Sequence, residues 1–427
     1  MALLGFFVVS LLAAWLVTLY RGSVALSGPV RLEGTGLSVS IPSGNGWKSE
    51  DNWRYQDNSF VLSSVFAAAG KNTPAVVNCR YLLAACETAV DTQFTEKASE
   101  VNGLIVQKAT IKRKTVSVDW AHITSPDIGL EIFLGVAALP DGRQLSIEVQ
   151  QVADGPDKAG ELFDRVIKSI AFKDDRLLAA GGETITAIKD KGVGSFTADA
   201  DRQSFFLIKR QSSEMIGFTM STVVSTASGI LLADFLYLPG LYSQEQVSLF
   251  ESDNRFDNFS WKSDTSSLVG ASGCQSVLND GVMTVIKSGR QVSENRYRLG
   301  PAAVPEFFLE FVCSLMLDSG RQKILIDVVG SNGTIIPAAV SVANKTDPAN
   351  GETGTAYVFN IDFLNEEGFS EQFCLDDKRH IIKAVLRQED TYVFERVEEK
   401  DILRRFPEQA DHVSYQSRLL KQDSKRP

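Results

Sequence analysis

The densest group of ionisable side chains in the sequence is the run Asp376-Asp377-Lys378-Arg379-His380. A carboxylate and an imidazole this close in sequence could act as general base and general acid, which makes Asp377 and His380 the candidate catalytic pair. The two aspartates could alternatively hold a cation. The same run separates two short apolar segments, and charged residues in that position are typical of a β-turn. We favour the turn.

Motifs of the common catalytic and cofactor sites are missing from the sequence, which contains no GxxxxGK[ST], HExxH or GxSxG pattern. A string beginning at Gly192 is similar to GxGxxG, but position 197 is threonine and no β–α–β pattern surrounds it. Only three histidines occur, so a multi-histidine metal site is hard to assemble. His122 lies beside Trp120 on a predicted strand, and we expect a satisfied structural residue. We predict no cofactor, no metal and no enzyme activity.

The five cysteines show no CxxC spacing, which argues against zinc knuckles and thioredoxin-type redox chemistry. Cys79 and Cys86 are the candidates for one disulfide, provided that the chain reaches an oxidising compartment. Cys313 falls within an apolar helical pattern, so we interpret it as a small core residue.

Composition and charge exclude several classes of protein. The chain has 427 residues, of which 44% are hydrophobic and 22% charged, as in ordinary globular proteins. This length predicts two domains. The net charge of −10 is shared by both halves, and no segment is basic enough to neutralise a phosphate backbone. Nucleic acid is therefore not an expected partner.

The N-terminus carries an uncharged apolar run at residues 2–20, long enough to cross a bilayer as a helix. We predict a signal anchor or a signal peptide within residues 1–25. Ser23-Val24-Ala25 would suit cleavage, but no Lys or Arg precedes the run, and we favour a retained anchor. A buried core helix is the third interpretation. With an anchor, the chain faces the periplasm or the cell exterior; with a cleaved signal, it is secreted.

A first domain is predicted at residues 30–175. Alternating segments at 37–41, 59–67 and 75–83 predict strands, and the period changes to a helical one at 87–101. The clearest signal is a hairpin at 131–150, whose turn Leu139-Pro140-Asp141-Gly142-Arg143 combines a fixed φ with a glycine. A helix over 157–172 closes the domain.

Three segments of this domain resemble the small α/β sandwich of the Mog1/PsbP-like group: the opening LSVSIPSGNGW, the hairpin through LPDGR and the closing helix AGELFDRVIKSIAF. The resemblance covers about a third of the chain. It implies a module that docks onto other proteins and has no catalytic activity.

A linker at residues 176–182, containing Ala179-Ala180-Gly181-Gly182, leads into a second domain predicted at 183–412, and residues 413–427 are expected to be a flexible tail. Alternating segments predict an antiparallel sheet, with strands at 204–210, 216–224, 231–238, 282–287, 291–299, 323–329, 334–342, 357–363 and a closing pair near 381–397. One helix interrupts them, beginning near Pro305 and ending at Gly320.

A curved antiparallel sheet closed by a helix resembles the lipoprotein-carrier (LolA/LolB-like) half-barrel. The resemblance implies that the concave face holds an apolar ligand or an extended segment of a partner. Phe307, Phe308 and Phe311 on the helix are the candidate ligand-binding residues, with a plain core role as the alternative that we favour.

The fold class is therefore α+β: a membrane-spanning or signal helix, a small α/β sandwich and a larger curved antiparallel β domain with one packed helix. The leading hypothesis is a non-enzymatic binding or assembly protein of the cell envelope, tethered through residues 2–20. The first alternative is a carrier that holds a lipid or other apolar ligand in the C-terminal half-barrel. The second is a hydrolase that uses Asp377 and His380.

Overall fold

The computed structural model describes residues 24–44, 46–66, 75–84, 88–113, 116–152, 159–174, 176–192, 202–211, 214–226, 229–239, 244–288, 292–343 and 357–414. The predicted membrane segment at residues 2–20 lies outside these ranges, as does most of the predicted tail. None of the helices in the described ranges is both long enough and apolar enough to cross a bilayer.

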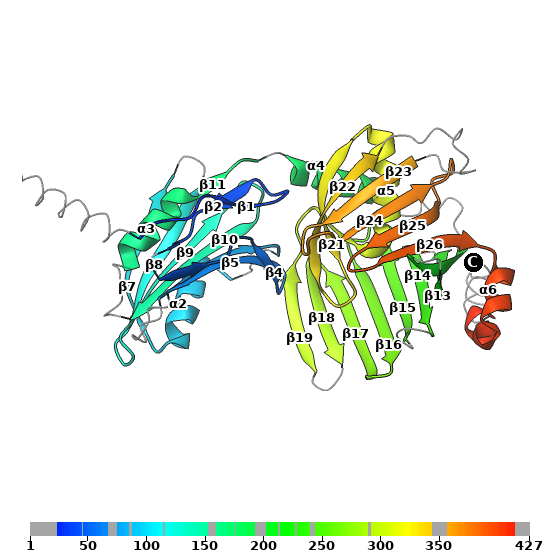
Figure 1. Cartoon of the computed structure of the whole chain (residues 1–427), viewed down its shortest axis with the longest axis horizontal. Helices are drawn as coiled ribbons and strands as arrows, with labels where there is room; N and C mark the ends of the chain where they lie inside the picture. The colour runs from blue at the N-terminus through cyan, green and yellow to red at the C-terminus, as the bar shows by residue number, and fades with distance from the viewer. Residues whose placement is uncertain are drawn as a thin grey trace, which may run out of the picture. The chain divides into compact units, whose positions relative to one another are not determined.

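The chain divides into two compact units, which are described separately here. One comprises Met1–Leu82 with Thr88–Asp174, and the other comprises Leu83–Glu87 with Asp175–Pro427. We call them the N-terminal unit and the C-terminal unit. Both are rich in β-strands (Figure 1).

The N-terminal unit is built on an antiparallel sheet with the strand order β3-β5-β6-β10-β9-β8-β7, in which β4 also pairs with β5. A second, three-stranded sheet has the order β1-β2-β11. The elements are β1 (Val30–Leu32), β2 (Leu37–Val39), β3 (Trp47–Ser49), β4 (Arg54–Gln56), β5 (Ser59–Phe66), β6 (Ala75–Leu82), α2 (Val90–Glu100), β7 (Leu104–Lys112), β8 (Ser117–Ser125), β9 (Leu130–Ala138), β10 (Gln144–Val152), α3 (Ala159–Ser169) and β11 (Ala171–Phe172).

Two helices cover opposite faces of the larger sheet. Phe94 of α2 packs in a cluster with Ile132 and Leu134 of β9, whereas Phe163 of α3 contacts the ring of Phe133 on the alternate face of that strand. The alternation of β9 therefore supplies both layers, as the period-two pattern of the sequence predicted.

The C-terminal unit contains a single sheet of fifteen strands in the order β19-β18-β17-β16-β15-β14-β13-β12-β26-β25-β24-β23-β22-β21-β20. Every neighbouring pair is antiparallel except β20 with β21. The strands are β12 (Arg202–Arg210), β13 (Met215–Ser225), β14 (Gly229–Leu238), β15 (Gln244–Asp253), β16 (Phe259–Ser267), β17 (Gly270–Asn279), β18 (Val282–Ser288), β19 (Ser293–Arg298), β20 (Ala303–Pro305), β21 (Lys323–Val329), β22 (Ile335–Ala343), β23 (Tyr357–Phe363), β24 (Ser370–Leu375), β25 (Ile381–Arg387) and β26 (Thr391–Val397).

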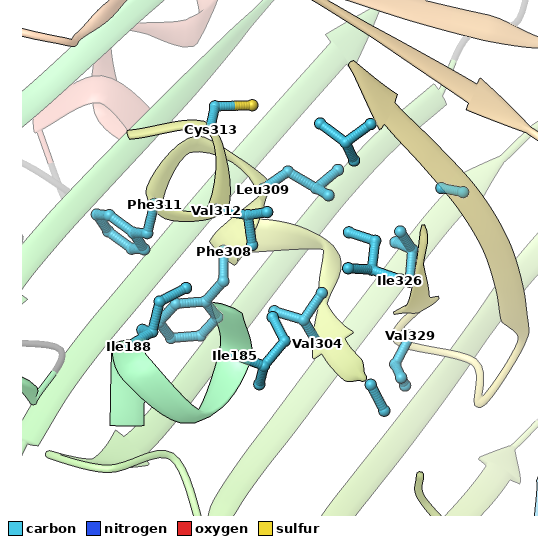
Figure 2. Packing of buried hydrophobic residues seen from close by; sticks show 14 of the residues in the cluster. Ile185, Ile188, Val304, Phe308, Leu309, Phe311, Val312, Cys313, Ile326 and Val329 are labelled. Carbon is cyan, nitrogen blue, oxygen red and sulfur yellow. The ribbon is translucent and has the colours of Figure 1, made fainter. Parts of the chain in front are cut away.

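The sheet curves so that its two halves enclose helices α4 (Leu177–Lys191) and α5 (Leu309–Ser319), the latter preceded by the 3-10 turn η2 (Glu306–Phe308) (Figure 1). One core cluster joins both helices to strands from both halves, for example Ile188 of α4, Phe250 of β15 and Phe359 of β23. Figure 2 shows part of this core, where Phe308 and Val304 lie close to Ile185. Outside the sheet, α6 (Glu399–Arg405) and η4 (Pro407–Gln409) cover a second cluster that includes Phe218 and Phe235.

The predicted linker at residues 176–182 is wrong in part, because α4 begins at Leu177 and the glycine pair lies inside it. Both glycines are buried, and a Cβ atom at Gly181 would overlap the carbonyl oxygen of Leu325 on β21. The composition that suggested a linker instead allows a helix to approach a strand at backbone distance.

The helix predicted between Pro305 and Gly320 is confirmed. Pro305 precedes η2, and Gly320 ends α5 with a φ of 69°, in the left-handed conformation that favours glycine.

Candidate functional site

The candidate catalytic pair lies in a tight turn between β24 and β25. The backbone N–H of His380 donates to Oδ1 of Asp376 at 2.8 Å, and its Nδ1 is 3.8 Å from the other oxygen of the same carboxylate. Asp377 is exposed. Arg379 has a φ of 68° and donates to Asp318 of α5 at 2.6 Å. The carboxylate beside His380 is thus that of Asp376 rather than Asp377, and the run has the geometry of the charged turn that we favoured.

The three candidate phenylalanines have different environments. Phe308 and Phe311 are buried, at 0% and 4% exposure, and their ring centroids lie 5.3 Å apart within the core. Phe307 is only half-buried, and its ring centroid is 4.8 Å from that of Trp261. The core interpretation holds for Phe308 and Phe311; Phe307 packs against the same core cluster and keeps part of its surface accessible.

Of the two cysteines of the candidate disulfide, only Cys79 lies among the described residues. Cys79 is fully buried on β6 and forms no disulfide with another described cysteine, and burial raises the pKa of its thiol to about 12. Cys86 lies outside the described residues, and its pairing stays a prediction. Cys313 is a buried free thiol of α5, as expected.

His122 on β8 packs as a structural residue, with its ring stacked on that of Phe133 at a centroid distance of 4.3 Å. Its Nε2 atom is buried and has no hydrogen-bond partner among the described residues. The expectation that the polar atoms of His122 are satisfied is therefore wrong for Nε2.

A row of polar side chains crosses the concave face of the C-terminal sheet, and sequence reasoning missed it. The strand register aligns Ser221 of β13, Asp234 of β14, Ser248 of β15 and Ser263 of β16. The hydroxyl of Ser248 donates to that of Ser263 at 3.0 Å, and both serines are almost fully buried. Gln246 on β15 donates to both hydroxyls.

Asp234 faces the interior because Ile230 and Leu232, on the same side of β14, belong to the central core. Burial raises the pKa of Asp234 to about 6, although a hydrogen bond from Ser221 acts in the opposite direction. Its Oδ1 atom is buried and has no hydrogen-bond partner among the described residues. A buried acceptor without a donor costs stability.

Glu306 in η2 is a second acidic residue with a raised pKa. Its side chain is exposed; neighbouring protein atoms, and then the charge of Asp234, raise its pKa to about 7.

Glu371 comes from the other half of the sheet. It lies on β24 on the same side as Phe373, which belongs to the central core, and it pairs in register with the buried Ile361. Burial, and then the charge of Glu306, raises the pKa of Glu371 to about 8.

We refer to the three carboxyl groups of Asp234, Glu306 and Glu371, which are linked by their charges, as the acidic recess. The three groups come from β14, η2 and β24. The charge of Asp234 contributes to the raised pKa of Glu306, and the charge of Glu306 contributes to that of Glu371. In the part of the chain that the structure describes, no three His, Cys, Asp or Glu side chains converge closely enough to hold a metal ion. When ionised, the carboxyls can accept hydrogen bonds or pair with a cation, and when protonated they can donate a hydrogen bond.

A signal for these residues was present in the sequence, since each of Asp234 and Glu371 is an acidic residue at an inward position of an alternating strand. What the sequence lacked was the pairing that brings residues 234, 306 and 371 together.

Comparisons with known proteins add little about this site. A β-barrel-like protein of the domain of unknown function DUF1849 from Brucella abortus has a crystal structure that is similar over 47% of this chain and 98% of that chain, with 10% identity and a TM-score of 0.35. A tail fibre of Staphylococcus aureus phage P68 is similar over 83% of this chain and 70% of that chain, with 8% identity and a TM-score of 0.11. No family model and no curated protein matches the sequence. The Mog1/PsbP-like and LolA/LolB-like resemblances stay predictions.

Proposed function

We propose that this chain is a non-catalytic binding protein that holds a guest molecule in the acidic recess of its C-terminal unit. The observation that carries the proposal is the inward-facing Asp234, whose raised pKa and buried Oδ1 atom mark an acidic position on the inner face of the sheet. Phe307, which follows Glu306 in the chain, keeps part of its surface accessible.

The energetic cost of the recess supports a functional role. The ionisation of Asp234 and Glu371 is opposed by burial, which weakens the fold near neutral pH, and apolar side chains at these two positions would remove that cost. Groups with perturbed pKa values in an enclosed site are typical of functional sites. The neighbouring hydroxyls of Ser248 and Ser263 bond to each other, which suits a polar lining better than nucleophilic catalysis.

We test the binding role by purifying the full chain in mild detergent, extracting bound small molecules and analysing them by mass spectrometry. A compound is expected to accompany the natural chain and the control Glu367→Gln, which changes an exposed glutamate of the turn before β24. The same compound should be reduced at least fivefold in Glu306→Gln and in Phe307→Ala. Equal amounts in all four proteins would contradict binding in the recess.

The proposal includes the membrane tether of residues 2–20, which would place both units outside the cytoplasm in the cell envelope. A reporter enzyme that is active only after export, fused after Asp174 at the end of the N-terminal unit, is expected to be active. Deletion of residues 2–20 should abolish that activity. A fusion that is equally active or equally silent with and without these residues would refute the tether.

A further inference from the structure

We propose that residues 415–427, which lie outside the described residues, pack against the outward face of β14 and β15, where Leu420 covers Leu231 and Ala233. The proposal concerns the side of the sheet opposite to that of Asp234, and it does not depend on the binding role proposed above. Three features support it: the burial of that face, the course of the described chain that leads to it, and the charge beside it.

The outward face of β13 and β14 remains buried beyond the cluster that α6 and η4 cover. Val224, Leu231 and Ala233 are only 1%, 7% and 4% exposed. They face away from the central core, because Val223 and Leu232 of the same two strands belong to it. The cluster beneath α6 and η4 lies on the same side of the sheet but does not include these three residues. The segment that shields them from water is therefore a further part of the chain.

The described chain runs along this face toward the buried residues. Glu408 accepts a hydrogen bond from the Tyr237 hydroxyl at 3.3 Å, and the ring of His412 stacks on that of Phe235 at a centroid distance of 4.8 Å. The contacts thus move back along β14. A strand rises about 3.3 Å per residue and a helix about 1.5 Å, so a helix continuing from His412 would reach the level of Leu231 about nine residues later.

The spacing of apolar residues places Leu420 on the side that faces the sheet. Residues 410–414 are helical, and Val413 within them is fully buried in the cluster under η4. Leu420 follows Val413 by seven residues, which is close to two helical turns and returns a side chain to the same face. A segment that keeps this spacing brings Leu420 onto the buried outward face.

The adjoining strand β15 matches the segment in apolar surface and in charge. Leu249 pairs in register with Ala233 and is 38% exposed, and the exposed Glu251 pairs with Leu231. Residues 415–427 contain four basic residues and one acidic residue, which gives a net charge of +3. A basic segment is favoured beside an exposed carboxylate.

The test is the reactivity of a thiol placed on the covered face by Ala233→Cys in the full chain. Alkylation at this position, measured by peptide mass spectrometry, is expected to be slow. It should become at least about tenfold faster when Leu420→Asp is added, and likewise when the chain is ended after Ser414. Leu268→Asp is the matched control, because Leu268 is 82% exposed at the tip of the β16–β17 hairpin, and it should leave the rate unchanged.

The native thiol of Cys313, fully buried in α5, reports opening of the core in the same samples. Its alkylation should stay slow in every variant. An equal acceleration at both thiols would show that Leu420 supports the whole core rather than covering one face, and would contradict the proposal.

The rival occupant of this face is the segment 193–201, which precedes β12 and also lies outside the described residues. Acceleration by Phe196→Asp but not by Leu420→Asp would assign the face to that segment. An unchanged rate in all of these variants would leave the face to another part of the chain or to a second copy. Either result overturns the proposal.

Discussion

Replacement of Phe308 by alanine is expected to destabilise the C-terminal unit by about 3–5 kcal/mol, the usual cost of deleting a large core side chain. Phe308 has no exposed surface, and its ring packs against those of Phe250, Phe256 and Phe311 at centroid distances of 5.6, 5.0 and 5.3 Å. These rings come from the sheet, a loop and α5, so the cavity would open where both helices meet the strands. Urea unfolding combined with hydrogen exchange of peptides from residues 303–329 measures the loss in this unit.

The neighbouring substitution Phe307→Ala is the control. Its side chain is half-buried, so we expect a loss of roughly 1–2 kcal/mol, scaled from the apolar area that it buries. If both variants lose the same stability, the assignment of Phe308 to the centre of the core and of Phe307 to its accessible margin is wrong.

Glu371→Gln is expected to stabilise the C-terminal unit at pH 8, on the order of 2–4 kcal/mol after allowance for the water that reaches the side chain. The unfolded chain releases the carboxyl proton near pH 4.3, whereas the folded chain holds it to about pH 8. The folded state therefore binds more protons between these values, and stability falls as the pH rises through this window. The amide of glutamine imitates the protonated carboxyl and does not titrate.

The same substitution should have little effect at pH 4, because the carboxyl is then protonated in the folded state and largely so in the unfolded state. Urea unfolding at pH 4, 6 and 8 measures the trend, and Glu367→Gln provides the exposed control. A stabilisation that is independent of pH, or a destabilisation at pH 8, would contradict the burial of this carboxyl.

The parts of the fold that were predictable depend on short-range signals. The hairpin expected at residues 131–150 is present as β9 and β10, because its turn residues fix the pairing within twenty residues of chain. The same holds for the helix that begins after Pro305 and ends at Gly320, where a restricted residue and a left-handed glycine mark the ends.

The sequence did not predict strands β15, β16 and β17, and the reason is the same as for the polar row on the concave face. Inward positions of these strands hold Ser248, Ser263 and Ser276 in place of apolar residues, which breaks the alternation by which a strand is recognised. These inward-facing hydroxyls therefore concealed the strands that carry them.

The three carboxyls themselves could not have been grouped from the sequence. Asp234 and Glu371 belong to strands in different halves of the sheet, with β13, β12, β26 and β25 between them. Only the curvature of the sheet and the entry of η2 bring them near Glu306. Such long-range pairing is fixed by the packing of the whole unit, not by any local pattern.

The placement of Gly181 inside α4 determines where this protein can be divided for experiments. A fragment that starts at residue 183, where composition alone would place the cut, loses the turn of α4 that rests on Leu325 and leaves Ile326 and its neighbours without their cover. A fragment that starts at Asp175 retains the whole helix. If the shorter fragment fails to fold, the missing turns of α4 explain the failure. Such a result would not show that the C-terminal unit is unable to fold by itself.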